Sequence, residues 1–544
     1  MNNASLLYRK ESGELNRLTN ENTFSHDENA GWDVVVLTAS NIRQAENYRY
    51  QIRYRIENGL LPAHTHFAVV PDYKNTHIGS GGATFNVLRF INEITGEEDC
   101  FSKLHILTIH SGGESVRIPQ YTVCGKLFAP IQRELSKGIS ATLFDEIFNS
   151  VKTLPSRSPA GMLTLSGDVL LVFDPTEVDL EECDAAAITA REDIDTGANH
   201  GVFIPDKQCN VKKFLHKLAV EDLKKNGAQG EDGKIHIDTG AVWFNGEVVK
   251  TLFNLVCNGK YFDLNKFEIF VNEKERLSFY ADMVYPIATE STLEQHLKEK
   301  SEGDNTAQLA FCRTALFKAL HKYKMKLIEP LNVAFIHFGT ASELLELMTV
   351  GITKYQALGW RNAVNSHINS EGRFTANGST VDIGSAVGNS CYIENSQLEN
   401  VIIGDRCIIS NIVLTDTEIP KDTVLHCLKQ KNGRYIVRIF GIDDNPKKTI
   451  EDGGMFHSIP LVDYMKMKNV TADELWDSKP FSLWNAKLFL EADHMDASLR
   501  HALCIYHISV SGDCWPHKQK LFSLKQSSEN ADFSSIWITG QDPL

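Results

Sequence analysis

The sequence predicts a doubly wound α/β domain, then a parallel β-helix and a mixed C-terminal segment. Up to about residue 365, short β-branched runs alternate with stretches typical of helices. Beyond that point apolar residues recur every six positions, a period that fits neither a helix nor a plain strand. The expected parts are a polar extension over 1–30, an α/β domain over 31–375, a β-helix over 376–430 and a mixed domain over 431–544.

Composition excludes several classes of partner. The chain has 544 residues and a net charge of −15, which argues against nucleic acid or an anionic membrane as the main partner. No stretch reaches the about 18 consecutive apolar residues of a membrane span, and the polar N-terminus lacks the apolar core of a signal peptide. The 11 cysteines show no metal-ligand spacing, so we expect reduced, mostly buried thiols and a cytoplasmic location.

Four apolar runs are expected to form buried strands of one parallel sheet, over residues 31–40, 67–73, 104–110 and 161–173. A helix is expected over 41–58, with Ser40 as its N-cap. A glycine-rich turn at 79–82 should precede a second helix ending near Gly96. Ligands of doubly wound sheets bind beyond the carboxyl ends of the strands, where this turn and a second one at 111–113 lie.

The six-residue repeat lies in the stretch "NVIIGDRCIISNIVLTDTEIPKDTVLHC". Its members are Val401, Cys407, Val413, Ile419 and Leu425, with Ile402, Ile408 and Leu414 at the same step. A parallel β-helix whose coils have three six-residue sides would produce this pattern. An irregular region of strands and turns is the alternative.

The stretch "HSGGESVRIPQYTVCGK", His110 to Lys126, follows the third expected strand. Its glycines allow backbone N–H groups to approach an anion closely. Arg117 and Lys126 could converge on one polyphosphate, Arg as a planar fork and Lys as a point charge. The same residues also suit a solvated turn with two surface cations. The spacing matches neither a Walker A loop nor a GxGxxG dinucleotide fingerprint.

The order of a Gly-Gly turn, an Arg, a Pro and a Lys resembles the signature of sugar-1-phosphate nucleotidyltransferases. Departures such as Ser115 in place of a further Gly indicate a particular branch. The segments "GSGGAT", "IHSGGESVRIP", "NHGVF", "FLHK" and "FGIDDNPKK" are similar to those of the fucose-1-phosphate guanylyltransferases, also called GDP-fucose pyrophosphorylases. The resemblance covers most of the chain. It implies a Rossmann-like nucleotidyltransferase domain and a left-handed β-helix.

The resemblance also implies a reaction in which GTP and fucose 1-phosphate give GDP-fucose and pyrophosphate. Arg117 and Lys126 should neutralise the departing pyrophosphate, while Lys217 should bind the sugar phosphate. Here Lys217 stands between His216 and Leu218, where relatives usually have Glu and Pro. The implied substrate-binding positions are Gly79, Gly81, Gly82, Thr84, Gly112, Gly113, Glu114, Ser115, His200, Gly201, Lys217, Asp238, Thr239 and Gly240.

A Mg²⁺ ion is the expected cofactor. Asp168, at the end of an expected strand, is where this fold class places a carboxylate ligand, and Asp282 is the candidate for a second one. The structural alternatives are a turn aspartate at Asp168 and a surface aspartate at Asp282. An ordinary hairpin turn likewise suits Asp238-Thr239-Gly240.

Other functions remain open on the sequence alone. The substrates could be another sugar 1-phosphate or another nucleotide, since no residue specifies guanine or fucose. A non-catalytic protein that acts through its β-helix in an assembly is a second alternative, and a homo-oligomer is possible in either case. A sugar kinase is disfavoured, because no kinase-type phosphate loop is found.

Overall fold

The computed structural model describes residues 31–96, 99–506 and 519–533, and the chain divides into two compact units. Unit 1 runs to residue 113 and resumes at 146–336, whereas unit 2 comprises 114–145 and the chain from 337 onward. The extension expected over 1–30 lies outside the described residues. The boundaries expected near 375 and 430 stay predictions.

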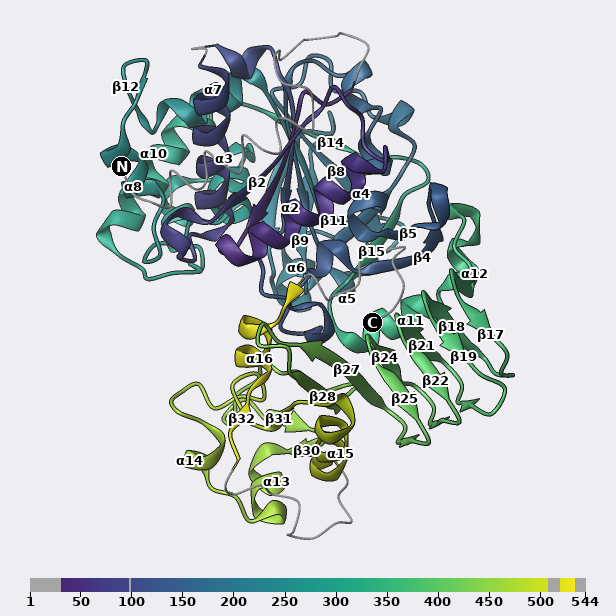
Figure 1. Ribbon diagram of the computed structural model, residues 1–544. Coiled ribbons are helices and arrows are strands. Elements are labelled where there is room, and N and C mark those ends of the chain that lie inside the picture. The colour runs from purple at the N-terminus through teal and green to yellow at the C-terminus, as the bar shows by residue number, and fades with distance from the viewer. Residues whose placement is uncertain (1–30, 97–98, 507–518, 534–544) are drawn as a thin grey trace. The chain divides into compact units, whose positions relative to one another are not determined.

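Unit 1 is built on a mixed sheet that is parallel at its centre (Figure 1). Strands β2, β1, β3 and β6 lie side by side in that order, and all three pairings are parallel. β11 joins β6 antiparallel and links the remaining strands. The strands of this sheet are β1 (Val34–Ala39), β2 (His66–Pro71), β3 (His105–His110), β6 (Gly161–Ser166), β8 (Ala185–Glu192), β9 (Gly201–Pro205), β10 (Val211–His216), β11 (Ile235–Asn245) and β14 (Met325–Ile328).

Helices pack along this sheet and bury a large apolar core (Figure 1). They are α2 (Ile42–Glu57), α3 (Gly79–Thr95), α5 (Ile194–Gly197), α6 (Val220–Lys225), α7 (Gly246–Asn254), α8 (Leu264–Phe270), α9 (Leu293–Lys298) and α10 (Ala307–Leu320). Short strand pairs join β7 (Val169–Val172) to β15 (Ala334–His337) and β12 (Cys257–Asn258) to β13 (Tyr261–Phe262). The chain returns from unit 2 to unit 1 between residues 145 and 146, and this boundary falls within helix α4 (Leu143–Val151).

The predicted strands and the helix after the first of them are confirmed, except that the run 161–173 forms two strands, of which only β6 joins the parallel sheet and β7 pairs with β15. Two further local corrections concern the start of each helix. Asn41, and not Ser40, caps α2, because its side chain accepts from Gln44 N. The glycines at 79–82 do not form a separate turn but the first turn of α3, which ends at Gly96 as expected. The run therefore begins a helix at the carboxyl edge of the sheet.

Unit 2 contains three parallel sheets whose strands follow one another in rotation. The first carries β16 (Ala363–Val364), β18 (Phe374–Asn377), β21 (Cys391–Glu394), β24 (Ile408–Ser410) and β27 (Thr423–Lys429). The second carries β17 (His367–Ile368), β19 (Thr380–Val381), β22 (Gln397–Glu399) and β25 (Val413–Thr415). The third carries β20 (Ala386–Val387), β23 (Ile402–Ile403) and β26 (Glu418–Ile419).

The register corrects the predicted repeat length. Tyr392 pairs with Ile408, and Ile402 pairs with Glu418, so one circuit of the chain takes 16 residues and not three sides of six. Two positions of the six-residue repeat are consequently not buried in the core: Ile402 is 56% exposed and Val413 is only half-buried. The apolar spacing thus correctly indicated stacked parallel strands. Two of the three sides of each circuit, however, are one residue shorter than the six that the spacing predicts.

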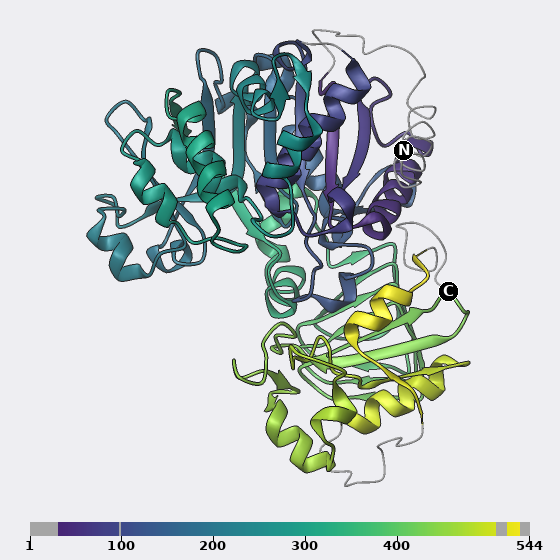
Figure 2. The same ribbon diagram turned by 90° about the vertical axis from the view of Figure 1, so that its left-hand side faces the viewer.

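The rest of unit 2 extends the first of these sheets. β28 (Tyr435–Gly441) pairs antiparallel with β27, and β31 (Phe489–Ala492) and β32 (Leu521–Phe522) follow. Helix α15 (Met495–Tyr506) packs along β28 and β31 (Figure 2). The other elements are β4 (Pro130–Glu134), β5 (Ser140–Thr142), α11 (Ala341–Met348), α12 (Ile352–Tyr355), β29 (Met455–Phe456), β30 (Ile459–Pro460), α13 (Leu461–Lys468), α14 (Ala472–Leu475) and α16 (Leu524–Asn530).

Two expectations about the whole chain can be compared with the described residues. Nine of their cysteines carry free thiols, as expected, but Cys504 is disulfide-bonded, so the prediction of reduced thiols is wrong there. None of the described helices has the length and apolar character needed to cross a membrane.

Candidate functional site

The candidate site in unit 1 lies at the carboxyl edge of the parallel strands. The chain passes from β1 to β2 on one side and then returns to β3 on the other side of β1. Ligands of such sheets bind beyond the strand ends at this reversal of strand order. The segments that leave β1, β2, β3 and β6 therefore define the site.

The Ser111–Gly113 segment leaves β3 and is fixed against β1 and α2. Ser111 Oγ donates to Thr38 O over 2.7 Å, and Ser111 N donates to the Thr38 hydroxyl over 3.1 Å. Tyr48 Oη donates to Ser111 O, and Gln44 Nε2 donates to Gly113 O, each over 3.0 Å. The stretch His110 to Lys126 is the predicted phosphate loop. Its first half is thus held in one place, while Gly113 is exposed.

His110 and Thr84 connect the start of this loop to α3. The Thr84 hydroxyl donates to Ser80 O over 3.0 Å and lies 3.2 Å from His110 Nε2. Burial lowers the pKa of His110 to about 4, so its ring is neutral at neutral pH. Thr84 is fully buried, which favours a supporting role over direct substrate contact. Gly112, two residues after His110, passes beside the backbone of Ser40.

Gly79 and Gly81 are explained by packing at the start of α3. Gly79 has a φ of +73°, and a β-carbon there would lie 2.4 Å from the carbonyl oxygen of Leu277. Gly81 N donates to that same carbonyl over 2.8 Å. Only glycine fits such a conformation and so close an approach. Both glycines thus have a structural role, and their predicted contact with the nucleotide, like that of Gly82, stays a prediction.

Asp168 lies in the turn between β6 and β7, at the carboxyl edge of the sheet. Ser166 Oγ donates to Asp168 Oδ1 over 2.8 Å. Gly167 N donates to His110 O over 2.9 Å, which ties this turn to the end of β3. Asp168 therefore lies in a turn that is tied to the end of β3, while its predicted role as a metal ligand stays a prediction.

Asp238 lies in a β-bulge of β11 next to that turn. The register of β11 shifts between Asp238 and Ala241, and Gly240 takes a φ of +82°. Gly240 N donates to Asp238 Oδ1 over 2.9 Å, and a β-carbon on Gly240 would lie 2.8 Å from Ser166 Cβ. Glycine is required here, because any other residue would push the two turns apart. Thr239 is buried and its hydroxyl donates to Ile188 O, and its predicted contact with substrate stays a prediction.

Tyr280 lies close enough to Asp168 and Asp238 for both of their charges to act on its hydroxyl. Its hydroxyl donates to Gly240 O over 3.2 Å. Burial, together with the negative charges of Asp238 and Asp168, raises the pKa of Tyr280 well above its ordinary value. Burial also raises the pKa of Asp238 to about 6, against the opposing effects of the Gly240 N–H and the Lys217 charge.

The residues predicted to bind the sugar phosphate come together beside Asp238. His216 on β10 pairs with Gly201 on β9, and Lys217 N donates to His200 O over 3.2 Å. Lys217 has a φ of +52°, a conformation that is costly for a residue with a side chain. Lys217 is close enough to Asp238 for its charge to lower the pKa of that carboxyl.

Asp282 does not fit the predicted role of a metal ligand. It is 2% exposed, and its Oδ1 accepts from Arg313 Nε over 2.7 Å while its Oδ2 accepts from Ser278 N over 2.7 Å. Burial alone would raise the pKa of Asp282, but His296 and Arg313 hold it below its ordinary value. The carboxylate is thus the anion of a buried ion pair, and the prediction is corrected accordingly.

The second half of the predicted phosphate loop, residues 114–126, belongs to unit 2. Ser115 has a φ of +54°, which explains why glycine is usual at this position in relatives, and its hydroxyl accepts from Lys126 N over 3.1 Å. Lys126 Nζ donates to Gly339 O over 3.2 Å. The pKa of Glu343 lies below its ordinary value, mainly through its hydrogen bond to His337 and in smaller part through the charge of Arg117. Both predicted cations thus face the chain around α11.

Asp168 and Asp238, whose charges both act on Tyr280, are the two carboxylates of unit 1 that could hold a metal ion in place of the predicted pair. No group of three or more His, Cys, Asp or Glu side chains that could hold a metal occurs within 31–96, 99–506 and 519–533. Magnesium, however, typically takes one or two protein carboxylates and completes its shell with substrate phosphates and water. A nearby cation would also favour the charged form of Asp238, which burial disfavours.

Within unit 1 the structure therefore brings together Asp168, Asp238, Gly240, Gly201 and Lys217, whereas Glu114, Ser115, Arg117 and Lys126 belong to unit 2. The sequence reasoning missed Tyr280, which only its place in the fold reveals. It also missed Asp72, which follows β2 at the same edge and whose pKa burial raises to about 7. An aspartate directly after an apolar strand was the signal that could have identified it.

Comparisons with known proteins give the family context. A family model described as the fucose pyrophosphorylase domain matches residues 98–490. A fucose-1-phosphate guanylyltransferase of Mus musculus is 27% identical over 497 residues, which cover 84% of this chain and 83% of the mouse protein. A Homo sapiens protein of the same name is 23% identical over 507 residues, with coverage of 84% and 81%.

A bifunctional fucokinase/GDP-fucose pyrophosphorylase of Arabidopsis thaliana is 28% identical over 510 residues. The match covers 84% of this chain but 46% of that relative, so the chain spans about half the length of the bifunctional protein. Because the family model covers well over half of the residues, in agreement with the resemblance seen in the motifs, the chain belongs to the fucose pyrophosphorylase family.

Proposed function

We propose that this protein transfers a guanylyl group from GTP to fucose 1-phosphate and releases pyrophosphate. Membership of the family and the names of the mouse and human relatives support the synthesis of GDP-fucose from fucose 1-phosphate. The structural observation that carries the proposal is the placement of Asp168, Asp238 and Lys217 at one edge of the unit 1 sheet. Two carboxylates beside a lysine suit the joining of two phosphorylated substrates.

The proposed reaction is an in-line displacement at phosphorus. A phosphate oxygen of fucose 1-phosphate attacks the α-phosphorus of GTP, and a new P–O bond forms. The bond from the α-phosphorus to the bridging oxygen of the β-phosphate breaks, and the electron pair leaves with pyrophosphate. No proton transfer is needed, since the attacking oxygen is already anionic, so catalysis consists of positioning and charge neutralisation.

Charged side chains have separate roles in this scheme. Lys217 holds the phosphate of fucose 1-phosphate, while Arg117 and Lys126 neutralise the charge that develops on pyrophosphate. Asp168 and Asp238 would hold Mg²⁺. When bound, that ion neutralises phosphate charge and orients the two substrates. Tyr280 keeps the Gly240 bulge, and with it Asp238, at a fixed distance from the Asp168 turn.

Backbone segments complete the proposed site. His200 and Gly201 border the sugar phosphate, and Gly112 and Gly113 present their N–H groups to the nucleotide phosphates. Glu114 and Ser115 continue that loop, and the start of α3 at Gly79, Gly81 and Gly82 lies on the side of the base and ribose. Thr84 and Thr239 support this arrangement from within the core.

The finer features of the fold are part of the same proposal. Unit 1 is proposed to be a doubly wound, Rossmann-like nucleotidyltransferase domain, supported by its order of parallel strands. The three rotating parallel sheets are proposed to be a left-handed β-helix, followed by a mixed C-terminal domain. We further propose a cytoplasmic protein that can form homo-oligomers.

The decisive experiment measures pyrophosphate release with each nucleoside triphosphate and a panel of sugar 1-phosphates in the presence of Mg²⁺. Release is expected with GTP and fucose 1-phosphate, but not with UTP and glucose 1-phosphate. A preference for another pair would assign a different substrate to the same chemistry. Absence of release with every pair would refute the enzymatic function.

A further inference from the structure

Within unit 2, a buried polar network holds the second half of the predicted phosphate loop against β21, β28 and α16. Between Arg117 and Lys126 the chain makes a short 3₁₀ turn, Pro119–Tyr121, and Pro119, Gln120 and Tyr121 are all buried. Three of the residues at 119–122 are bound by side chains that follow more than two hundred residues later in the chain. Each of these bonds involves a group that is itself buried.

Arg438 on β28 forms the first attachment. Its side chain is 0% exposed, and Nη2 donates to Pro119 O over 2.7 Å. Nη1 donates to Ser528 Oγ over 2.7 Å and to Leu524 O over 3.0 Å, and Nε donates to His426 Nε2 over 2.9 Å. The planar guanidinium thus joins the loop to α16 and β27 at fixed angles, which lysine could not do.

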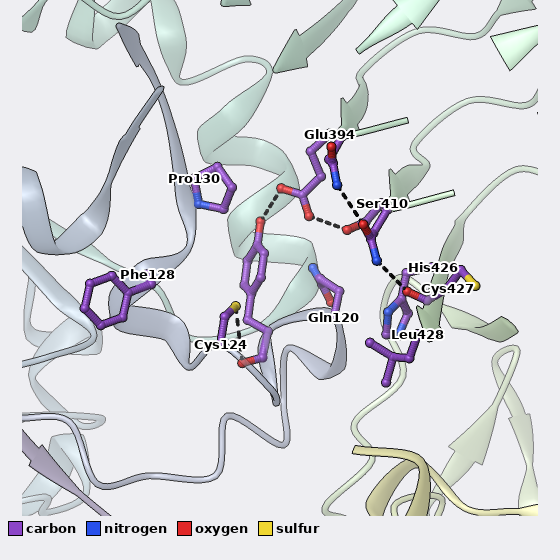
Figure 3. Close-up of a pocket in the computed structure, with 12 residues that line it drawn as sticks. Gln120, Cys124, Phe128, Pro130, Glu394, Ser410, His426, Cys427 and Leu428 are labelled. Atoms are coloured by element: carbon purple, nitrogen blue, oxygen red, sulfur yellow. Dashed lines mark hydrogen bonds between the residues drawn. The ribbon is translucent and has the colours of Figure 1, made fainter. Parts of the chain in front are cut away.

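Glu394 on β21 forms the second attachment (Figure 3). Its side chain is 2% exposed; Tyr121 Oη donates to its Oε2 over 2.7 Å, and Ser410 Oγ donates to its Oε1 over 2.6 Å. Burial raises the pKa of Glu394 against the effect of these hydrogen bonds. A buried carboxylate is costly unless its oxygens are satisfied, so the loop must stay in place for this side chain to be stable.

A third attachment and a small cavity complete the network. Thr122 Oγ1 lies 2.7 Å from Ser528 Oγ on α16. A cavity of about 30 Å³ is lined by Gln120, Asn395 and neighbouring side chains of the stacked strands. Neither polar atom of the Gln120 amide is hydrogen-bonded to a described residue. The space is large enough for water, which would give this amide both an acceptor and a donor.

We propose that Arg438 and Glu394 are positioning residues for the reaction, because they fix the loop that carries Arg117 and Lys126. This inference rests on the proposed function. Both cations act on pyrophosphate charge, and a displacement of about 1 Å in a charged group can cost on the order of 10²-fold in rate. Neither Arg438 nor Glu394 is proposed to contact substrate. Arg438 and Glu394 bind Pro119 and Tyr121, and in this way they fix the distance between Arg117 and Lys126.

Three variants test the inference. Tyr121→Phe removes the hydroxyl that binds Glu394, Glu394→Gln removes the charge and one acceptor, and Arg438→Lys removes the fork. In each, kcat should fall at least about tenfold and inhibition by pyrophosphate should weaken. The KM for fucose 1-phosphate should stay unchanged, because Lys217 belongs to unit 1.

Asp444→Asn is the matched control. The Asp444 carboxylate is also buried in unit 2 and accepts from Gly441 N, His457 N and Ser458 N, with no contact to the loop. This variant should lose stability while keeping kcat at the wild-type value in the folded protein. A loss of kcat as large as that of Tyr121→Phe would mean that general destabilisation explains the result, and the positioning role would be overturned.

Amide hydrogen exchange gives a readout that does not need activity. In Tyr121→Phe and Arg438→Lys, amides at 118–126 should exchange faster, whereas those of β27 and β28 keep their protection. Wild-type protection of 118–126 in both variants overturns the inference whatever the kinetics. If the wild-type protein releases no pyrophosphate while these amides still lose protection, the attachment of the loop is supported and the proposed function alone has failed.

Discussion

Arg313 Nε donates to Asp282 Oδ1 over 2.7 Å in the core of unit 1, where the two side chains are 1% and 2% exposed. His296 lies 3.5 Å from the same oxygen. Asp282, which the sequence predicted to be a metal ligand, is therefore the acidic partner of a buried ion pair. Removing one partner of such a pair leaves an uncompensated charge inside the protein.

Asp282→Ala should therefore destabilise the protein without a specific effect on metal use. We expect a loss of about 3–5 kcal/mol in the free energy of unfolding, because Arg313 is left buried and unpaired. Urea unfolding measures the loss. At a temperature where the variant is folded, its activity should depend on Mg²⁺ concentration as in the wild type. A large increase in the Mg²⁺ requirement would restore Asp282 as a metal ligand.

Asp168→Asn and Asp238→Asn should have the opposite profile. Each keeps the shape of the side chain while removing a charge that we assign to Mg²⁺, so turnover should fall at least about 10²-fold. Pyrophosphate release measured against Mg²⁺ concentration checks this, with urea unfolding as the control for stability. Normal turnover in Asp238→Asn would return this residue to the sugar-contacting role that the sequence suggested.

Local patterns were sufficient to predict the elements that depend on local chemistry. The apolar run at 34–39, the helix that follows it and the strand at 105–110 were all found, because burial of a parallel strand leaves a continuous apolar signature. The glycine run at 79–82 was misread as a turn. Its glycines serve a close contact with Leu277, about two hundred residues away, which no local pattern encodes.

The site was predictable only in part for the same reason. Gly112 and Asp168 follow expected strands, so topology alone placed them at the binding edge. The surroundings of Asp238 and Asp282 depend on contacts that are distant in sequence: the bulge after Asp238 brings Gly240 to Ser166, and Arg313 forms an ion pair with Asp282. The repeat length was misjudged because each 16-residue circuit has two sides of five residues and one of six, and a short stretch fits a step of six almost as well.

Lys217→Gln should separate the two substrates. Because Lys217 lies with His200 and Gly201 on the proposed sugar side, we expect the KM for fucose 1-phosphate to rise at least about tenfold, the effect of losing a charge-assisted hydrogen bond. The KM for GTP should change little. Initial rates measured at varied concentrations of each substrate test this. An equal rise in both KM values would show that Lys217 supports the whole site.

Lys126→Met should reveal the role of this lysine through the product. If Lys126 neutralises pyrophosphate, kcat should fall at least about 10²-fold, and inhibition by added pyrophosphate should weaken in parallel. Lys137→Met removes another lysine of unit 2, an exposed one in the turn between β4 and β5, and is the matched control. Unchanged inhibition by pyrophosphate in Lys126→Met would assign the lysine to another part of the nucleotide.

His426 should make the stability of the protein depend on pH. It is 1% exposed and its Nε2 accepts from Arg438 Nε, and burial together with the Arg438 charge lowers its pKa well below the ordinary value. The folded state thus keeps His426 neutral, whereas the unfolded chain takes up a proton below about pH 6.5. Because the unfolded state binds more protons, the free energy of unfolding should fall as the pH decreases from about 6.5.

The contribution of His426 can be isolated by substitution. His426→Gln keeps a neutral acceptor for Arg438 but cannot titrate, so its unfolding free energy should fall less steeply between about pH 6.5 and pH 5. The slope should be smaller than that of the wild type by up to about 1.4 kcal/mol per pH unit. Urea unfolding at several pH values measures it, with His494→Gln, which removes an exposed histidine, as the control. Equal slopes in wild type and His426→Gln would show that His426 takes up its proton in the folded state as well, and that its hydrogen bond with Arg438 gives way when it does.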